Sequence, residues 1–214
     1  MRNKNYLFIY LYEFLFLLIV VHSCTIQRVT RSSVDDGSTT LTKYDSVHIR
    51  TFNMENAFKK QTISSQDDIF FEEIKGDDVK KLIGINDYTW VIVAASWCPH
   101  CHNEVPRVSG ILEELKEYNI KPIIIFQNYD IKATQELLYS AHWDEQTYII
   151  DAKTYGSVEP QKHLKIRKEI CPECDNTTTG IPAQYIFNKK GEMLLLKFGE
   201  GITVEKIKEA INFK

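Results

Sequence analysis

Two cysteines separated by two residues, Cys98 and Cys101, are the part of this sequence best suited to chemistry. Two thiols at this spacing can close into a disulfide, or one can attack a foreign disulfide while the other displaces the product. His100 stands between them and can donate a hydrogen bond to a thiolate, which stabilises the charged sulfur. The pattern therefore predicts thiol–disulfide exchange, with Cys98 as the attacking thiolate and Cys101 as the resolving thiol.

The flanking residues place this pair between a strand and a helix. Residues 90–95 form a nearly unbroken apolar run whose length suits one buried strand. From Pro99 to about residue 118, apolar residues recur at the spacing of an amphipathic helix, and proline suits its first position. Cys98 then lies at a helix N-terminus, where free N–H groups and the dipole favour a thiolate. A purely structural disulfide is the alternative, but a strand, Trp97, CxxC and a helix in succession favour redox chemistry.

This segment resembles the active-site helix of the thioredoxin superfamily, and within it the TlpA/ResA-like thiol–disulfide oxidoreductases of bacterial envelopes. Trp97, the two cysteines and Pro106, which kinks the helix in that superfamily, carry the resemblance. Glu104 completes the CxxCxxExP form of the TlpA/ResA-like group. The dipeptide between the cysteines, Pro99-His100, is instead similar to that of DsbA-type oxidases, so the direction of electron flow stays open.

The sequence departs from thioredoxin at one position that matters for proton transfer. Ile92 stands where thioredoxin has a buried acid in the preceding strand. Glu104, three residues after Cys101 on the same helix face, is then the candidate for that role. A solvated helix carboxylate is the alternative interpretation of Glu104.

A second element of the resemblance lies at Gly180-Ile181-Pro182, which begins a GIPxxxxFxxxGE pattern. The resemblance implies that Pro182 is a cis-proline packed against the dithiol. It also implies that the backbone of Ile181 pairs with an extended substrate segment, which is a case of β-augmentation. An ordinary turn proline is the alternative.

The order of the remaining elements predicts the fold class. Apolar runs predict strands at 69–71, 123–126, 148–150, 184–187 and 194–198, and helical spacing predicts helices at 77–83, at 131–141 and after Thr203. The strand–helix–strand succession at the CxxC implies a right-handed crossover and parallel pairing. The order is similar to an α/β thioredoxin-like three-layer α/β/α sandwich with a central mixed sheet.

An insert at about 157–179 interrupts the resemblance and carries a second pair, Cys171 and Cys174. A local disulfide that stiffens the insert is one interpretation. A redox relay with the first pair and a zinc site shared by all four cysteines are the others. The basic stretch 162–168 within the insert is interpreted as a solvated helix face, because acidic residues flank it.

The first pair also matches CxxCH, a c-type haem attachment motif that ends at His102. Such a haem needs a second axial ligand, and Met1, Met54 and Met193 stand in no obvious ligand loop. No metal and no organic cofactor is therefore expected. A non-catalytic binding module, with both CxxC pairs as inert staples, is the remaining alternative.

The N-terminus predicts export and a lipid anchor. Residues 1–23 carry early positive charges and an apolar run and match a lipoprotein signal peptide. The resemblance of 21–24 to a lipobox implies lipidation of Cys24; an uncleaved anchor or another cleavage site is the alternative. Thr25 after that cysteine favours the outer membrane in Gram-negative lipoproteins. The sequence predicts a flexible tether at residues 24–46 and the thioredoxin-like domain at residues 47–214.

Composition is consistent with these assignments. The 214 residues are 43% hydrophobic with a net charge of −3, which fits one globular domain with extensions and gives no reason to expect nucleic acid. The expected partners are cysteine-containing envelope proteins and a membrane thiol–disulfide donor or acceptor. The expected location is the periplasmic face of a bacterial envelope membrane.

Overall fold

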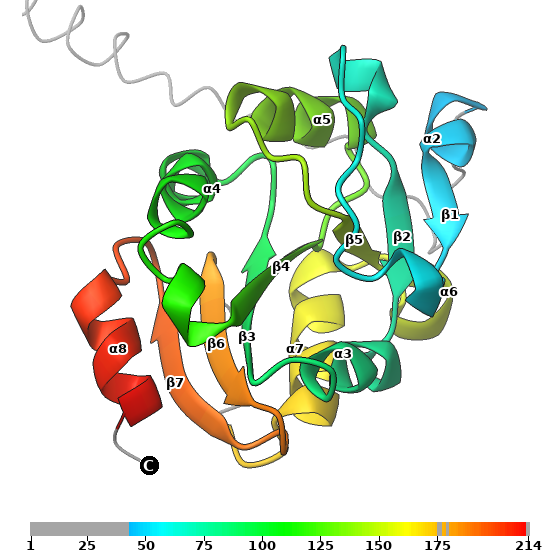
Figure 1. Cartoon of the computed structure of the whole chain (residues 1–214). Coiled ribbons are helices and arrows are strands. Elements are labelled where there is room, and N and C mark those ends of the chain that lie inside the picture. The colour runs from blue at the N-terminus through cyan, green and yellow to red at the C-terminus, as the bar shows by residue number, and fades with distance from the viewer. Residues whose placement is uncertain (1–42, 175–176, 179, 213–214) are drawn as a thin grey trace, which may run out of the picture. The chain divides into compact units, whose positions relative to one another are not determined.

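A mixed sheet of seven strands runs through the part of the chain that the structure describes, in the order β1-β2-β5-β4-β3-β6-β7 (Figure 1). This computed structural model describes residues 43–174, 177–178 and 180–212, so the predicted signal peptide, Cys24 and most of the predicted tether lie outside the described residues. The first five strands in that order pair in parallel. β6 pairs antiparallel with β3, and β7 pairs antiparallel with β6. The bounds are β1 Ile49–Thr51, β2 Phe71–Ile74, β3 Tyr88–Ala94, β4 Ile120–Phe126, β5 Thr147–Ile150, β6 Ala183–Asn188 and β7 Met193–Phe198.

Helices cover both faces of this sheet (Figure 1). One layer consists of α4 (Pro99–Ile111), α5 (Ile131–Ser140) and α8 (Val204–Asn212), and the other of α3 (Gly76–Ile83) and α7 (Glu159–Ile170). This architecture confirms the predicted thioredoxin-like three-layer sandwich with a mixed sheet. Within the described residues, no helix combines the length and the apolar character that a membrane span requires. The short elements are α2 Lys43–His48, α6 Ala152–Tyr155, and the 3-10 turns Met54–Asn56, Gln66–Asp68 and Lys116–Tyr118.

The strand before the first cysteine pair is buried on both sides. Trp90, Ile92 and Ala94 of β3 pack into the core beneath α4 and α8. Val91 and Val93 pack into the core beneath α3 and α7. Because β3 lies between β4 and β6 and both its faces are covered, it needs a continuous apolar sequence rather than an alternating one.

Element ends differ from the sequence-based expectation at three places. α4 ends at Ile111 rather than near 118; turns at 112–115 and the 3-10 turn Lys116–Tyr118 follow, and Asn119, whose φ of 49° is left-handed, leads into β4. The expected strand at 69–71 begins at Phe71, after a turn that the side chain of Asp68 caps. α2 begins at Lys43, so the expected domain boundary at 47 falls inside a helix; the Tyr44 hydroxyl bonds Asp67 and Gln135 at 2.6 and 2.7 Å.

Most of the expected insert is the helix α7, which packs against the sheet beside α3. Lys165 and Lys168 are exposed, as the solvated-face interpretation expects, but Lys162 and Arg167 are 1% and 0% exposed, so that interpretation was wrong for these two residues. The flanking acids form hydrogen bonds elsewhere: Glu159 bonds Trp97, and Glu169 bonds Tyr155.

Candidate active site

The first cysteine pair lies where β3 gives way to α4. Cys98 is the N-cap residue of α4, with an extended backbone at φ −89° and ψ 114°, and Pro99 takes the first helical position. The backbone N–H of Cys101 bonds the carbonyl of Cys98 at 3.0 Å and so begins the first turn. Both residues are free thiols. This placement puts the Cys98 sulfur at the positive end of the helix dipole.

The two thiols have different environments. Cys98 is 3% exposed, whereas Cys101 is fully buried beneath the helix. Burial raises the pKa of the Cys101 thiol far above its usual range; a hydrogen bond with Cys98 and the nearby carboxylate of Glu104 add to the effect. The Cys101 thiol therefore stays protonated at neutral pH, and Cys98 is the less buried of the two residues.

The second predicted element meets the first in space. The peptide bond between Ile181 and Pro182 is cis, and Pro182 is buried just before β6. The Cys98 thiol donates a hydrogen bond of 3.6 Å to the carbonyl of Ile181. Segments more than eighty residues apart in sequence thus bring Pro182, the carbonyl of Ile181 and the Cys98 thiol together.

Trp97, directly before the cysteine pair, contacts the start of α7. Its side chain is 49% exposed, and its indole Nε1 donates a hydrogen bond of 2.7 Å to Oε2 of Glu159. Val158, immediately before α7, is also 49% exposed. Sequence reasoning missed Glu159 as a site residue because it was interpreted only as an acid that flanks a solvated basic stretch, and no motif marks it.

His100 points toward another part of the chain. Its side chain is 64% exposed, and its Nδ1 lies 3.4 Å from Oε1 of Glu200, just before α8. The amide of Asn103 donates to the other oxygen of Glu200 at 2.9 Å. Glu200 is a second residue that sequence reasoning missed.

Glu104 is buried rather than solvated, so the alternative interpretation of this residue was wrong. Its carboxylate is 0% exposed and accepts two hydrogen bonds from Arg107, one of them from Nε at 2.9 Å. It also accepts a hydrogen bond of 2.8 Å from the backbone N–H of Gly201. The pair therefore fastens the active-site helix to the segment that precedes α8, and it holds a negative charge one turn from Cys101.

The second cysteine pair lies away from the first. Cys171 and Cys174 form a disulfide directly after the C-terminal end of α7, whereas Glu159 at its other end contacts Trp97. A helix of this length spans about 18 Å. Direct exchange needs contact between sulfurs, and a shared zinc ion needs all four within bonding distance, whereas here the length of α7 separates the two pairs.

The haem alternative does not fit the site either. Thioether bonds need both sulfurs at the surface of a macrocycle, but Cys101 is fully buried. The ring of His102 is bonded through Nε2 to the carbonyl of Ser96. Among the described residues, no group of three or more His, Cys, Asp or Glu side chains could hold a metal ion.

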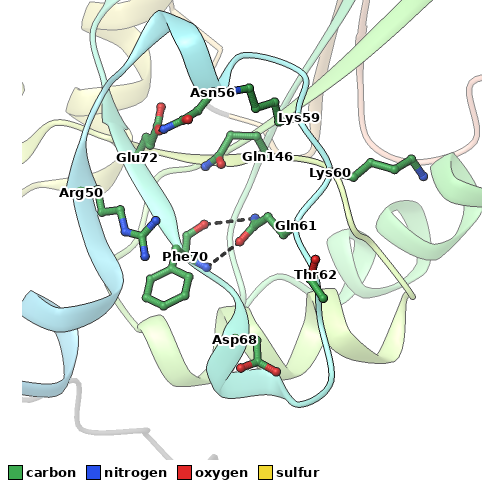
Figure 2. Close-up of a pocket in the computed structure, with 10 residues that line it drawn as sticks. All are labelled: Arg50, Asn56, Lys59, Lys60, Gln61, Thr62, Asp68, Phe70, Glu72 and Gln146. Carbon is green, nitrogen blue, oxygen red and sulfur yellow. Dashed lines mark hydrogen bonds between the residues drawn. The ribbon is translucent and has the colours of Figure 1, made fainter.

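A separate hollow of about 260 Å³ lies beside β1 and β2 (Figure 2). The guanidinium of Arg50 stacks over the ring of Phe70 at 3.8 Å. The amide of Gln61 bonds both the N–H and the carbonyl of Phe70 (Figure 2). Three strands separate β1 from β3, the strand that precedes Cys98. The hollow is lined by none of the predicted site residues.

No family model and no curated protein matches the chain. The comparison with solved structures does find similar folds. The thioredoxin domain of a thiol-disulfide oxidoreductase from Bacteroides vulgatus is 10% identical, with a TM-score of 0.46 over 61% of this chain and 81% of that one. StoA from Bacillus subtilis is 20% identical, with a TM-score of 0.42 over 58% and 81%. A thioredoxin family thiol:disulfide interchange protein from Chlorobium tepidum is 12% identical, with a TM-score of 0.47 over 76% and 98%.

Proposed function

We propose that this protein is a thiol–disulfide oxidoreductase of the bacterial envelope that reduces or exchanges disulfides through Cys98 and Cys101. The Cys98 thiolate attacks one sulfur of a substrate disulfide, which forms a mixed disulfide and releases the other substrate sulfur as a thiolate. Cys101, once deprotonated, then attacks the sulfur of Cys98 and expels the reduced substrate. The protein is left with a Cys98–Cys101 disulfide, having given two electrons to the substrate; the reverse sequence oxidises a dithiol.

One observation carries this proposal. The least buried sulfur of the pair stands at the N-terminus of α4 and against the carbonyl of Ile181, at the cis bond to Pro182. The helix terminus favours the thiolate that the first step needs. The backbone at Ile181 offers a hydrogen-bonding edge to an extended peptide that carries the attacked sulfur.

The partners follow from this chemistry. The substrates would be cysteine-containing envelope proteins, and a membrane thiol–disulfide donor or acceptor would restore the dithiol or the disulfide. Attachment through a lipid on Cys24 would keep the domain at the periplasmic face of the membrane, the outer more than the inner. The exchange steps use only cysteine sulfurs and protons, and no cofactor is part of the proposal.

The test compares single cysteine variants on a protein substrate with a known disulfide. Cys98→Ser should abolish exchange, whereas Cys101→Ser should trap a mixed disulfide that survives non-reducing electrophoresis and disappears with a reductant. The control, Cys171→Ser/Cys174→Ser, should retain exchange. Undiminished exchange by Cys98→Ser would refute the proposal and leave a binding module as the alternative.

A glutathione titration of the first pair, with Cys171 and Cys174 replaced by Ser, would settle the direction of electron flow. A reduction potential around −270 mV would identify a reductant that needs a membrane electron donor. A value around −120 mV would identify an oxidant that introduces disulfides into secreted proteins.

A further inference from the structure

Phe70 lines the hollow beside β1 and β2 and is held there by two neighbours (Figure 2). The side-chain amide of Gln61 accepts a hydrogen bond of 2.9 Å from the N–H of Phe70 and donates one of 3.2 Å to its carbonyl. The ring of His48 stacks with the Phe70 ring, with 5.5 Å between the two centroids. Both the backbone and the ring of Phe70 are therefore fixed in position.

Arg50 enters the hollow from β1, and its guanidinium carbon lies 3.8 Å from the centroid of the Phe70 ring (Figure 2). A cation–π contact of this kind fixes one face of the guanidinium and leaves its N–H donors free. Arg50 stands opposite Glu72 in the pairing of β1 with β2, but the two form no ion pair. Across the described residues, no acceptor bonds the Arg50 guanidinium. The hollow therefore contains a positioned cation whose hydrogen bonds the protein leaves unmade.

The two acids of the lining, Glu72 and Asp68, already have hydrogen-bond donors of their own. Glu72 is 2% exposed, and its two oxygens accept bonds from the side-chain amide of Asn56 at 2.7 Å and the N–H of Asn53 at 3.1 Å. Oδ2 of Asp68 accepts bonds of 2.8 and 2.7 Å from the backbone N–H groups of residues 64 and 65. These donors stabilise both charges, so neither carboxylate depends on a cation of the hollow.

Of the two lysines that line the hollow, one is paired and one is not. The ammonium of Lys60 lies 2.9 Å from Asp144 and 3.8 Å from Glu145, and the side chain reaches away from the hollow (Figure 2). Lys59 forms no ion pair with any residue that the structure describes. Arg50 and Lys59 are thus the charged groups of the lining that lack partners, and two such cations favour an anionic ligand.

We propose that this hollow binds a small oxyanion, a carboxylate or a phosphate, with Arg50 as its main ligand and Lys59 as a second positive charge. The planar guanidinium presents parallel N–H groups, which a carboxylate or phosphate group accepts in pairs. The volume of about 260 Å³ is just below the range of sites for drug-sized ligands, so the ligand is a small molecule. Binding here is independent of Cys98 and Cys101, because three strands separate β1 from β3.

The test measures the binding of inorganic phosphate and of malonate to the full chain by isothermal titration calorimetry at constant ionic strength. Malonamide, the neutral diamide of malonate, shows whether charge is required.

Each titration is repeated in Arg50→Gln, in Arg50→Lys, which keeps the charge but not the planar group, and in Lys59→Gln. Lys132→Gln, at an exposed lysine of α5 that does not line the hollow, is the control with the same change of charge as Arg50→Gln.

At least one of the two anions should bind, and malonamide should not; the anion that binds more tightly identifies the oxyanion group that the hollow takes. The affinity should fall about tenfold in Arg50→Gln, because hydrogen bonds to a charged group are lost, and Arg50→Lys should restore only part of it. Lys59→Gln should show a smaller loss, which decides the test if Arg50→Gln does not fold.

Three results would each overturn the proposal. The first is that neither anion binds the parent chain below about 10 mM. The second is an affinity that Arg50→Gln leaves unchanged in the folded protein. The third is an equal loss in Arg50→Gln and in Lys132→Gln, which would mean that the anions respond to the net charge of the chain and not to the hollow.

Discussion

The indole Nε1 of Trp97 and the carboxylate of Glu159 are joined by a hydrogen bond of 2.7 Å. Trp97 directly precedes the cysteine pair, and Glu159 is the first residue of α7, more than sixty residues later. The helix that replaces the expected insert is therefore tied to the rim of the proposed active site. The Trp97 side chain is half exposed, and this bond helps to fix where its ring lies.

Replacing Glu159 by alanine should loosen Trp97 and weaken the binding of protein substrates. A hydrogen bond to a charged group at a partly exposed site is worth about 1 kcal/mol, which corresponds to about a fivefold rise in KM for a protein disulfide. Turnover of a small disulfide should change little. Glu159→Gln, which keeps an acceptor oxygen, serves as the control. Acrylamide quenching of Trp97 fluorescence should rise in Glu159→Ala only, because Trp90 and Trp143 are buried; equal quenching in both variants would contradict this role.

What the sequence predicts well here is local and periodic. The apolar run of β3, the proline at the first position of α4 and the pattern around Pro182 each depend on a few neighbouring residues, and the structure has these elements close to the expected positions. Glu159 and Glu200 could not be found this way. Each contacts the site through a tertiary approach of a distant segment, and an isolated glutamate carries no periodic signal.

Burial should make the Cys101 thiol unreactive over the ordinary pH range. Its pKa is raised, so the thiolate fraction stays small and alkylation by iodoacetamide should be slow at pH 7 to 9. In a Cys98→Ser chain that also lacks Cys24, the rate should rise about tenfold per pH unit up to pH 10 without levelling. In urea the same thiol should level off near its ordinary pKa of about 8.5. A plateau below pH 9 in the folded protein would show that this thiol is not desolvated.

The buried pair of Glu104 and Arg107 should contribute to stability as a unit. Arg107→Ala leaves a fully buried carboxylate with only the N–H of Gly201, so the free energy of unfolding in urea should fall by about 2 kcal/mol. Glu104→Gln/Arg107→Ala should recover part of this loss, because the uncompensated charge is gone.

A matched cycle on the exposed pair of Glu113 and Lys116 tests whether burial is the cause. That pair has the same i,i+3 spacing with both side chains at least 75% exposed. Its coupling energy should be below about 0.5 kcal/mol. Similar coupling energies for the two pairs would mean that the burial of Glu104 has no energetic consequence.

His163 should make the fold less stable as the pH falls. It is fully buried, with Nε2 3.1 Å from the Tyr185 hydroxyl, and burial, aided by the charge of Arg167, lowers its pKa to about 3. Between that value and about 6.5, the unfolded chain binds a proton that the folded chain does not. The free energy of unfolding should therefore fall by about 2 kcal/mol from pH 6 to pH 4.5.

Two variants separate this effect from general acid destabilisation. His163→Gln removes the titration and should flatten the pH dependence over this range, even if its stability at pH 7 is lower. His142→Asn, at an exposed histidine, should leave the slope unchanged. An unaltered slope in His163→Gln would assign the acid sensitivity to carboxylates.

The buried bases of α7 also show where sequence reasoning reaches its limit. Lys162, His163 and Arg167 are all nearly or fully buried, although charged residues flanked by acids normally indicate solvent. Ile166 and Ile170 pack into the core beneath α7, and the basic side chains close to them on the helix are buried there too. Lys162 stacks over Tyr129 at 4.6 Å, and Arg167 over Phe198 at 5.4 Å. Such aromatic partners come from distant strands and loops, so the helix sequence alone does not reveal them.

The two cysteine pairs should differ in reduction potential because they lie at opposite ends of their helices. Cys98 precedes α4, where the helix dipole stabilises a thiolate, whereas Cys171 follows the last turn of α7, where free carbonyls oppose one. The reduced form of the first pair is therefore favoured, and the Cys171–Cys174 disulfide should have the more negative potential. Titration of the intact chain with a thiol redox buffer, read by alkylation and peptide mass spectrometry, should reduce the first pair before the second. Co-reduction at one potential, or the reverse order, would mean that the local charges around the second pair outweigh the dipole.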